Sequence, residues 1–544
     1  MSRQVGAKAA VAVFFALLTL LGLMVTDDYG QPSDEWLEQY ILQSNLHEYA
    51  VRLWGPESEA ARWYASRGIQ PISQNQERDH GQCAYYAFVP LLTRLLSEPD
   101  RLMLAWHAYT WLWFMVGCFA LYGFCRETGL GRVNSCLGTL LLYLSPRFFA
   151  EGHYNNKDMV LLSLVLCTLW LGARFLRQPG FLRGLLFSLA GAMATNTKIA
   201  GGFAWAVMGL CAVVLVTASR RWSARMAVVA LWTIAAFVGL YGLLTPMYWS
   251  GVGENVRYLL DNASSFSRWT GLVVFRDEIY DQAKQPLPRY YLIWMMLTTL
   301  PLYVTPLAAA GQIGALVRVC GQKARALRDP VSLSLTAASL CWFVPLLFAV
   351  LMRPTVYNGW RHFYFVFAGV AVLGAHGISI CFRLAKRYGG DCSIQYVFMA
   401  GLLLFYGWTA AAIVQNHPYQ YAYYNRLGHE DAQTGMELDY WEVSTRNAME
   451  QLLSCQERDE GLPLHVGARE DMSWWGVYNA YQVMNPQERE RLSVAYEKDA
   501  PYLFFNTTYT RLYGTQTPKG YHELFSLQSY GLTICTVYEK LIGI

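Results

Sequence analysis

A long succession of apolar segments constrains this chain more than any other feature. A helix needs about 20 apolar residues to cross the roughly 30 Å hydrocarbon core of a bilayer. With 54% hydrophobic residues among 544, the chain is too apolar for a soluble protein of this length. We therefore predict a mainly α, polytopic membrane protein with about eleven transmembrane helices. The predicted helices are 9–25, 102–124, 134–150, 159–173, 184–195, 201–217, 226–247, 290–317, 331–352, 363–380 and 396–414.

The basic residues between these segments are unequally distributed. If the N-terminus is cytoplasmic, the short connections on the opposite side carry only Lys157, Lys198, Arg353 and Arg361. Cytoplasmic loops are enriched in lysine and arginine. We therefore predict a multi-pass protein of the bacterial inner (plasma) membrane, with the N-terminus inside and the C-terminus outside. The basic residues of the cytoplasmic connections are Arg126, Arg132, Arg174, Arg177, Arg183, Arg220, Arg221, Arg225, Arg318, Lys323, Arg325, Arg328, Arg383, Lys386 and Arg387.

With this orientation, the unusual polar clusters fall on the extracytoplasmic face. One is the sequence EGHYNNKDMV, in which His153 and Asp158 stand between two apolar segments. Ionisable groups in or beside membrane segments are rare and mark functional sites. The gathering of such groups on one side predicts a site at the outer membrane surface. The other clusters are 27–81, TNTK at 195–198, 250–288 and YNGWRH at 357–362.

The composition changes near residue 414 and suggests two regions. Residues 1–414 form the predicted transmembrane domain, whose first extracytoplasmic loop (27–101) carries short interfacial helices. Residues 415–544 are more polar, and short apolar runs alternate with helical stretches. That pattern is typical of a small α/β domain. Cys455 and Cys535 lie in this region and can pair if it is exported.

The outer clusters hold the groups that sugar transfer from a lipid-anchored phosphate requires. A carboxylate must take the proton of an acceptor hydroxyl. Cationic groups or a metal ion must stabilise the leaving phosphate. The candidate acids are Asp34, Asp79 and Asp158, and the candidate cations are Lys198, Arg268 and Arg361. The net charge of +4 is too small to indicate a nucleic-acid partner.

Single residues of these clusters also have structural explanations. Asp34 precedes an amphipathic pattern and Asp158 opens an apolar segment, so either can be a helix N-cap. Lys157 can anchor its helix at the interface. His80 can be an ordinary surface residue. The prediction of a site depends on the convergence of these residues on one face.

The order of short motifs along the chain adds a family resemblance. The sequence QPSDEWLEQYILQS contains Asp34 and Glu35, and RDHGQCAYYAFVPLL contains Asp79 and His80. HYNNKDMVLL, a Thr-Lys pair ending at Lys198, SSFSRW and RHFYF follow in that order. Nearly the whole chain thus resembles the GT-C glycosyltransferases that use lipid-linked sugars, specifically the group of protein O-mannosyltransferases and the lipid A aminoarabinose transferase.

The resemblance implies roles for individual residues. It makes Asp34 the catalytic base or the acid that orients the acceptor, with Asp158 in support, and Glu35 is the third predicted catalytic residue. It makes Lys198, Arg268 and Arg361 the phosphate-binding groups. The remaining predicted substrate-binding residues are Asp79, His80, His153 and His362. The histidine that helps to bind metal in the aminoarabinose branch has no counterpart near Arg268, and the double proline before the second outer helix is replaced by Gly81–Gln82. The sequence therefore leaves open whether a divalent metal ion is a cofactor.

We therefore predict an inverting, mannosyltransferase-like hexosyl- or pentosyltransferase. Its donor is a polyprenyl-phosphate sugar, and its acceptor is a hydroxyl group of a protein, lipid or glycan. Two rival classes are a secondary transporter and a non-catalytic membrane scaffold with an outer domain. Transporters keep their charged groups near the bilayer midplane, whereas here they cluster at one surface. A polymerase or ligase with a diphosphate-linked donor is a third alternative.

Overall fold

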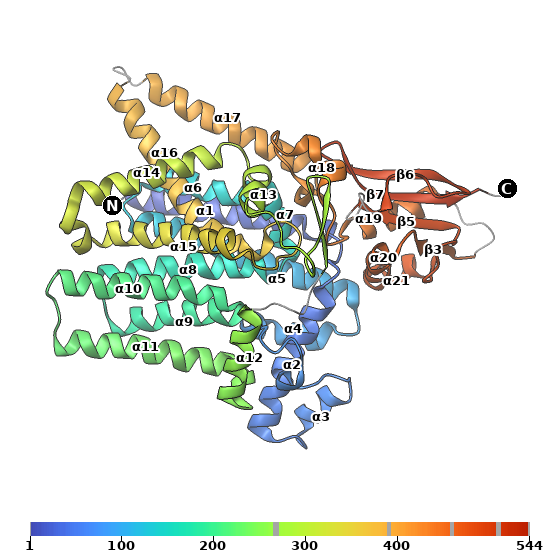
Figure 1. The fold of residues 1–544 in the computed structure, drawn as a ribbon, viewed down its shortest axis with the longest axis horizontal. Helices are drawn as coiled ribbons and strands as arrows, with labels where there is room; N and C mark the ends of the chain where they lie inside the picture. The colour runs from blue at the N-terminus through green and yellow to red at the C-terminus, as the bar shows by residue number, and fades with distance from the viewer. Residues whose placement is uncertain (1, 265–270, 389–392, 457–461, 508–512, 542–544) are drawn as a thin grey trace.

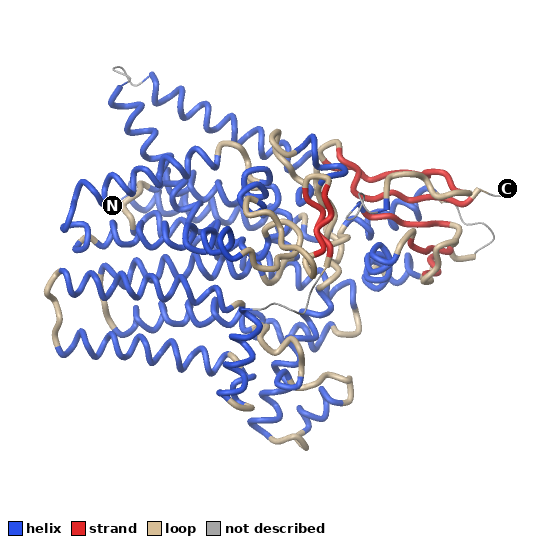
Figure 2. The backbone as a smooth tube through the Cα atoms, in the orientation of Figure 1, coloured by secondary structure: helices blue, strands red, loops and turns tan. Residues whose placement is uncertain are grey.

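The computed structural model describes residues 2–264, 271–388, 393–456, 462–507 and 513–541. It is mainly helical, with a bundle of long helices at one end and a small sheet region at the other (Figures 1 and 2). The α-helices are α1 (Ser2–Met24), α2 (Glu35–Trp54), α3 (Glu59–Ala65), α4 (Val89–Leu95), α5 (Pro99–Glu127), α6 (Arg132–Tyr143), α7 (Pro146–Tyr154), α8 (Asp158–Arg177), α9 (Phe181–Thr197), α10 (Gly202–Ala218), α11 (Ala224–Leu244), α12 (Val252–Ser264), α13 (Tyr291–Thr299), α14 (Val304–Gln322), α15 (Pro330–Met352), α16 (Phe367–Tyr388), α17 (Ser393–Gln415), α18 (His429–Gly435), α19 (Ser444–Cys455), α20 (Asp471–Val483) and α21 (Pro486–Arg489).

Short 3₁₀ helices and seven strands complete the described secondary structure. The 3₁₀ helices are η1 (Thr26–Asp28), η2 (Ile72–Gln74), η3 (Cys83–Phe88), η4 (Ile199–Gly201), η5 (Pro246–Trp249), η6 (Lys323–Arg328), η7 (Arg361–Val366) and η8 (Gln420–Ala422). The strands are β1 (Leu272–Phe275), β2 (Glu278–Asp281), β3 (Leu464–Ala468), β4 (Leu492–Val494), β5 (Tyr502–Asn506), β6 (Tyr521–Ser529) and β7 (Leu532–Lys540).

Nine helical segments in the described part of the chain are long and apolar enough to cross a membrane. The protein is therefore an integral, multi-pass membrane protein, as its composition predicts. The segments are Gly6–Asp28, Pro99–Glu127, Asp158–Arg177, Ile199–Ala218, Ala224–Leu244, Val304–Arg328, Pro330–Met352, Arg361–Tyr388 and Ser393–Gln415.

Prolines explain where the observed helices differ from the continuous runs expected from sequence. The run 134–150 is divided into α6 and α7 before Pro146, and the run 290–317 is divided into α13 and α14 around Pro301. Proline lacks an amide hydrogen, and its ring disfavours helical geometry at the preceding residue. Each break leaves a short helix at the outer end of the bundle. The expected span 184–195 is α9, which is 17 residues long.

Close helix contacts within the bundle depend on small residues. α14 packs along α16, and α5 and α9 each pack against α8. A Cβ atom at Gly311 would lie 1.8 Å from the carbonyl oxygen of Leu373, and one at Gly377 would lie 1.8 Å from that of Leu307. Glycine at both positions lets the two backbones touch, as is usual where membrane helices pack.

The C-terminal sheet region, from α18 to β7, lies beyond one end of the bundle of long helices (Figure 1). Its five strands have the order β4-β3-β5-β7-β6. β3 is parallel to β4 and β5, while β7 is antiparallel to β5 and β6. α19 and α20 pack on the sheet, which gives the α/β architecture expected from the alternating pattern. The expectation that Cys455 can pair with Cys535 is wrong: both are free, one exposed at the end of α19 and the other buried in β7.

Candidate active site

A cavity of about 570 Å³ lies where the ends of the long helices meet the C-terminal sheet region. Segments far apart in sequence line it. Asp34 comes from the loop before α2, Asp158 from the start of α8 and Lys198 from the end of α9. Arg361 opens η7, and the segment Tyr440–Glu442 comes from the C-terminal sheet region. The acids and cations selected from sequence thus share one hollow.

Asp34 occupies the N-cap position of α2, but its side chain makes no capping hydrogen bond. The Asp34 side chain is 46% exposed, and its Oδ2 lies 3.8 Å from a guanidinium nitrogen of Arg361. The carboxylate therefore points toward the cavity and is not used to satisfy the helix terminus. Such a carboxylate can accept a proton from a bound hydroxyl group.

Arg361 is held rigidly at the cavity wall. It donates a hydrogen bond of 2.9 Å to the Tyr440 hydroxyl. Its guanidinium carbon lies 4.1 Å from the ring centre of Trp441 and 4.7 Å from that of Tyr357. Stacking on aromatic faces suits the planar guanidinium and leaves its edge available for anions. The Arg361 side chain is only 7% exposed, so water screens its charge weakly.

Asp158 and Lys198 form an ion pair at the floor of the cavity. The side chain of Asn155 caps α8 instead of Asp158, because its Oδ1 accepts a 2.9 Å hydrogen bond from the Asp158 amide. The capping explanation for the Asp158 carboxylate is therefore wrong. Burial lowers the pKa of the Lys198 ammonium, and the Asp158 carboxylate opposes that shift. The Asp158 carboxylate thus helps to keep the buried Lys198 side chain positively charged.

A second polar chain lines the side of the cavity near α2. The Lys157 ammonium lies 3.1 Å from a carboxylate oxygen of Glu38 and 2.7 Å from Nδ1 of His80. His80 Nδ1 also lies 3.0 Å from Glu77. Asp79 accepts a 2.6 Å hydrogen bond from the amide of Asn262. Lys157 thus contacts charged partners and does not extend as a simple membrane anchor.

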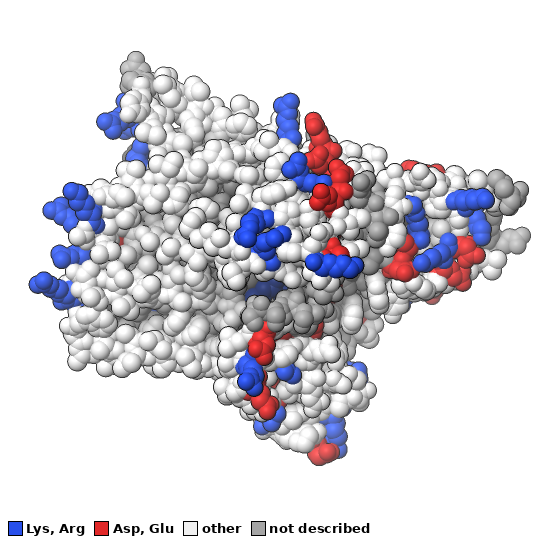
Figure 3. Space-filling view, viewed as in Figure 1, with Lys and Arg blue, Asp and Glu red and all other residues white. Residues whose placement is uncertain are grey.

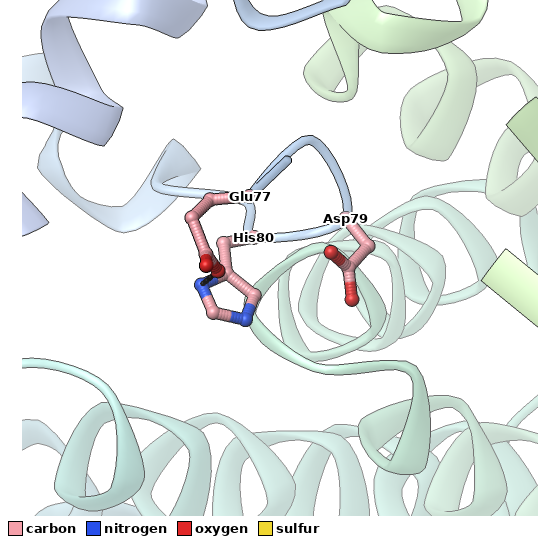
Figure 4. Close-up of side chains that lie close together, drawn as sticks. All are labelled: Glu77, Asp79 and His80. Atoms are coloured by element: carbon pink, nitrogen blue, oxygen red, sulfur yellow. Dashed lines mark ion pairs between the residues drawn. The ribbon is translucent and has the colours of Figure 1, made fainter. Parts of the chain in front are cut away.

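Glu77, Asp79 and His80 are a candidate site for a divalent cation. They project the same way from one loop, with Glu77 and His80 in an ion pair and Asp79 beside them (Figure 4). One ligand atom from each lies within 4.8 Å of the others. An imidazole and two carboxylates are ligands that several divalent metals accept. These three side chains therefore fit a divalent ion. The sequence left a metal ion open as a cofactor but did not indicate which residues would bind it.

Two of the residues selected from sequence are placed differently, and a third lies outside the described residues. His153 is fully buried between Tyr29 and Trp111, with ring centroids 4.4 and 4.2 Å away, and is not part of the cavity wall. The expectation that His153 binds substrate is wrong in this structure, because packing encloses its ring. Glu35 borders the cavity, but its carboxylate lies 2.7 Å from Nε2 of the buried His107. Arg268 lies outside the described residues.

His362 and the segment Tyr440–Glu442 complete the lining. His362 packs against the ring of Tyr357, with centroids 4.4 Å apart. The sequence analysis missed the 440–442 segment as a source of site residues. No local pattern indicates which turn of the C-terminal sheet region folds over the membrane helices. The only sequence signal is the aromatic pair Tyr440–Trp441 beside an acid.

The C-terminal sheet region also holds the loop that carries Asp34. The Ser33 amide donates a 3.0 Å hydrogen bond to the Trp441 carbonyl, and the Asn479 side chain donates one of 3.2 Å to the Ser33 carbonyl. A Cβ atom at Gly30 would lie 2.3 Å from the Val443 carbonyl oxygen. Only glycine lets the two backbones approach this closely.

We expect Gly30→Val to displace the Asp34 loop. Overpacking of this kind costs about 1–3 kcal/mol, and activity should fall roughly tenfold because a misplaced catalytic group loses its geometry. Thermal unfolding in detergent and turnover should both be measured. Gly131→Ala is the control, since nothing lies within 4 Å of its added Cβ. Unchanged turnover of Gly30→Val would show that the loop does not need this contact.

Comparisons with known proteins give structural neighbours only. No protein-family model matches the chain, and no curated protein matches it by sequence. The chain is similar to ArnT from Cupriavidus metallidurans in the apo state, with 12% identity, a TM-score of 0.49 and 98% of both chains covered. ArnT bound to undecaprenyl phosphate gives 12% identity and a TM-score of 0.45, over 97% of this chain and 98% of that one. Arabinofuranosyltransferase AftD from Mycobacteria gives 15% identity and a TM-score of 0.43, over 97% of this chain and 41% of that one. The function is inferred below from the residues of the cavity.

Proposed function

We propose that this protein is a membrane glycosyltransferase that moves a sugar from a polyprenyl-phosphate donor to a hydroxyl acceptor. The observation that carries the proposal is the exposed Asp34 carboxylate, which shares one cavity with the cations Arg361 and Lys198. A base and a phosphate-binding pair are the minimum for this chemistry. The sequence resemblance to GT-C enzymes supports the same reaction class.

The proposed step is a single displacement. The acceptor oxygen attacks the anomeric carbon while the bond from that carbon to the phosphate oxygen breaks, which inverts the configuration. Asp34 takes the hydroxyl proton. Arg361 and Lys198 stabilise the negative charge on the departing polyprenyl phosphate, and Asp158 positions Lys198. Glu35 supports the start of α2 through His107. A phosphate contact from Arg268 remains a prediction from sequence.

A divalent ion is compatible with this scheme. Glu77, Asp79 and His80 would hold it, and it would supply positive charge toward the donor phosphate. His80 contacts Lys157 as well, so the protein places its own cation beside the same group.

The charge distribution supports an extracytoplasmic site. On the face shown in Figure 3, basic residues gather at the end of the bundle away from the C-terminal sheet region, a band almost free of charged side chains follows, and both signs of charge appear toward the other end. Membrane proteins retain basic residues on the cytoplasmic side. We infer that the N-terminus is cytoplasmic and that the cavity opens at the outer face of a bacterial inner membrane. A polyprenyl tail can then lie in lipid with its head group in the cavity.

The rival functions explain the cavity less well. A transporter would place its charged groups near the bilayer midplane, whereas Asp34, Lys198 and Arg361 lie at helix ends. A scaffold gives no reason for a carboxylate at an N-cap position that does not cap its helix. The cavity does not distinguish a monophosphate from a diphosphate donor, and the experiment below includes both.

We expect the purified protein to label a membrane extract when it is supplied with a radiolabelled polyprenyl-phosphate sugar. The panel should contain hexose and pentose donors as monophosphates and diphosphates, with the free sugars as controls. Transfer from one lipid donor and none from the free sugars is the expected result, because the cations bind the phosphate. Failure of every lipid donor with protein, lipid and glycan acceptors would refute the proposed function.

A further inference from the structure

The cavity contains a carboxyl group to which the scheme above gives no role. Glu442 lines the cavity but belongs to the C-terminal sheet region, just before α19. Glu442 is only 4% exposed. Its Oε2 is fully buried and has no hydrogen-bond partner of normal geometry among the described residues, and the Gly476 amide is the backbone donor near its carboxyl group. A buried polar atom without a partner costs about 1–3 kcal/mol, so its retention in a cavity wall points to a ligand.

The backbone conformation at Glu442 and the space beside its side chain are both unusual. Glu442 has a φ of +57°, in the left-handed region that residues other than glycine rarely adopt. Strained residues of this kind concentrate at functional sites. Gly476 of α20 provides the necessary space, because a Cβ there would lie 2.8 Å from Glu442 Cβ and 3.2 Å from its Oε2. Two unusual local features thus combine to seat one carboxyl group beside the cavity.

The surroundings of Glu442 are acidic. Asp439 lies in the same segment, Glu470 precedes α20, and Asp34 faces it from the loop before α2. Burial, followed by these three carboxylates, raises the pKa of Glu442 well above its usual range. The nearby Asp439 already accepts hydrogen bonds from Ser444 and Asn506. The raised pKa favours the protonated form of the Glu442 carboxyl group.

We propose that Glu442 is a substrate-contacting residue that donates a hydrogen bond from its neutral carboxyl group to an oxygen of the sugar or acceptor in the cavity. This inference rests on the proposed glycosyl transfer and assigns the C-terminal sheet region a direct part in it. A neutral donor beside Asp34 can hold a hydroxyl group without competing for the proton that Asp34 removes. A carboxylate there would repel Asp34 and bind an ammonium group instead.

Two substitutions separate these alternatives. Glu442→Ala should lower kcat/KM about 10- to 100-fold, since one buried hydrogen bond to substrate is lost. Glu442→Gln keeps a neutral donor of nearly the same shape and should stay within about threefold of wild type. Loss in both variants would show that the charge is required and would overturn the neutral-donor proposal. Wild-type kcat/KM in Glu442→Ala would overturn the substrate contact.

Glu437→Gln is the matched control. Glu437 is buried in the same region, and its Oε2 likewise has no hydrogen-bond partner among the described residues. It accepts a 2.9 Å hydrogen bond from the Val274 amide and lines a small pocket of about 20 Å³, not the cavity that holds Asp34. We expect this variant to keep wild-type kcat/KM and thermal stability. A loss in Glu437→Gln equal to that in Glu442→Ala would mean that the assay reports folding of the region, which would also contradict the proposal.

An infrared measurement tests the protonated carboxyl without any transfer reaction. The difference spectrum of wild type minus Glu442→Gln at pH 7 should contain a protonated-carboxyl band, and the band should shift when a polyprenyl-phosphate sugar is added. A carboxylate band in its place would overturn the neutral-donor proposal. If no donor supports transfer but the band is present and shifts, the proposed function fails while the contact made by Glu442 stands.

Discussion

Asp34→Asn is expected to lower kcat for sugar transfer by about 10²- to 10⁴-fold, the usual contribution of a general base. Asparagine keeps the shape of the side chain but cannot accept the proton of the acceptor hydroxyl. Helix α2 should still form, because the Asp34 side chain makes no capping bond to it. KM for the donor should change little, since Arg361 and Lys198 remain to bind the phosphate.

The control for Asp34→Asn is the same substitution at an acid near it in the sequence that does not line the cavity. Asp27 is such a residue: it is 65% exposed, and its Oδ1 lies 3.4 Å from Arg446. Exposed ion pairs contribute at most about 1 kcal/mol, so Asp27→Asn should retain full turnover. Kinetics on both variants, with thermal unfolding in the same detergent, distinguish lost chemistry from lost folding. Wild-type turnover in Asp34→Asn would place the base elsewhere.

The bundle and much of its outer site follow from sequence because both depend on simple rules. Apolar length identifies membrane helices, and ionisable residues at their ends are costly enough to mark a site. Asp34, Asp158, Lys198 and Arg361 were selected this way, and all four line one cavity. The rule does not give the ends of every helix: the runs containing Pro146 and Pro301 are each divided into two helices, whereas Pro345 lies inside the continuous helix α15.

What the sequence could not predict depends on contacts between distant segments. His153 sits in the same polar motif as Asp158, yet the rings of Tyr29 and Trp111 enclose it. Nothing in the motif gives the direction of its side chain. Glu442 shows the opposite case: an acid in the turn before α19 becomes part of the site because Gly476 leaves room for it and Ser33 pairs with Trp441.

Arg361→Ala is the second substitution expected to have a large effect, with kcat lowered by about 10²- to 10³-fold, the range found when one donor to a developing negative charge is removed. The effect should be large because the guanidinium is held by Tyr440 and by aromatic rings, and no rearrangement is needed as the phosphate departs. Arg361→Lys should recover only part of the loss. A lysine keeps the charge but not the planar fork or the stacking on Trp441.

Arg67→Ala is the matched control for the lost stacking. The Arg67 guanidinium carbon lies 3.9 Å from the ring centre of Trp63. Both residues lie at or just after α3 and do not line the cavity. This variant loses an arginine–aromatic contact worth about 0.5–1 kcal/mol at an exposed site and should keep its turnover. Steady-state kinetics at saturating donor separate kcat from KM. If Arg361→Ala raises KM alone and leaves kcat intact, Arg361 binds the ground-state phosphate without stabilising its departure, and Lys198 becomes the main electrostatic group.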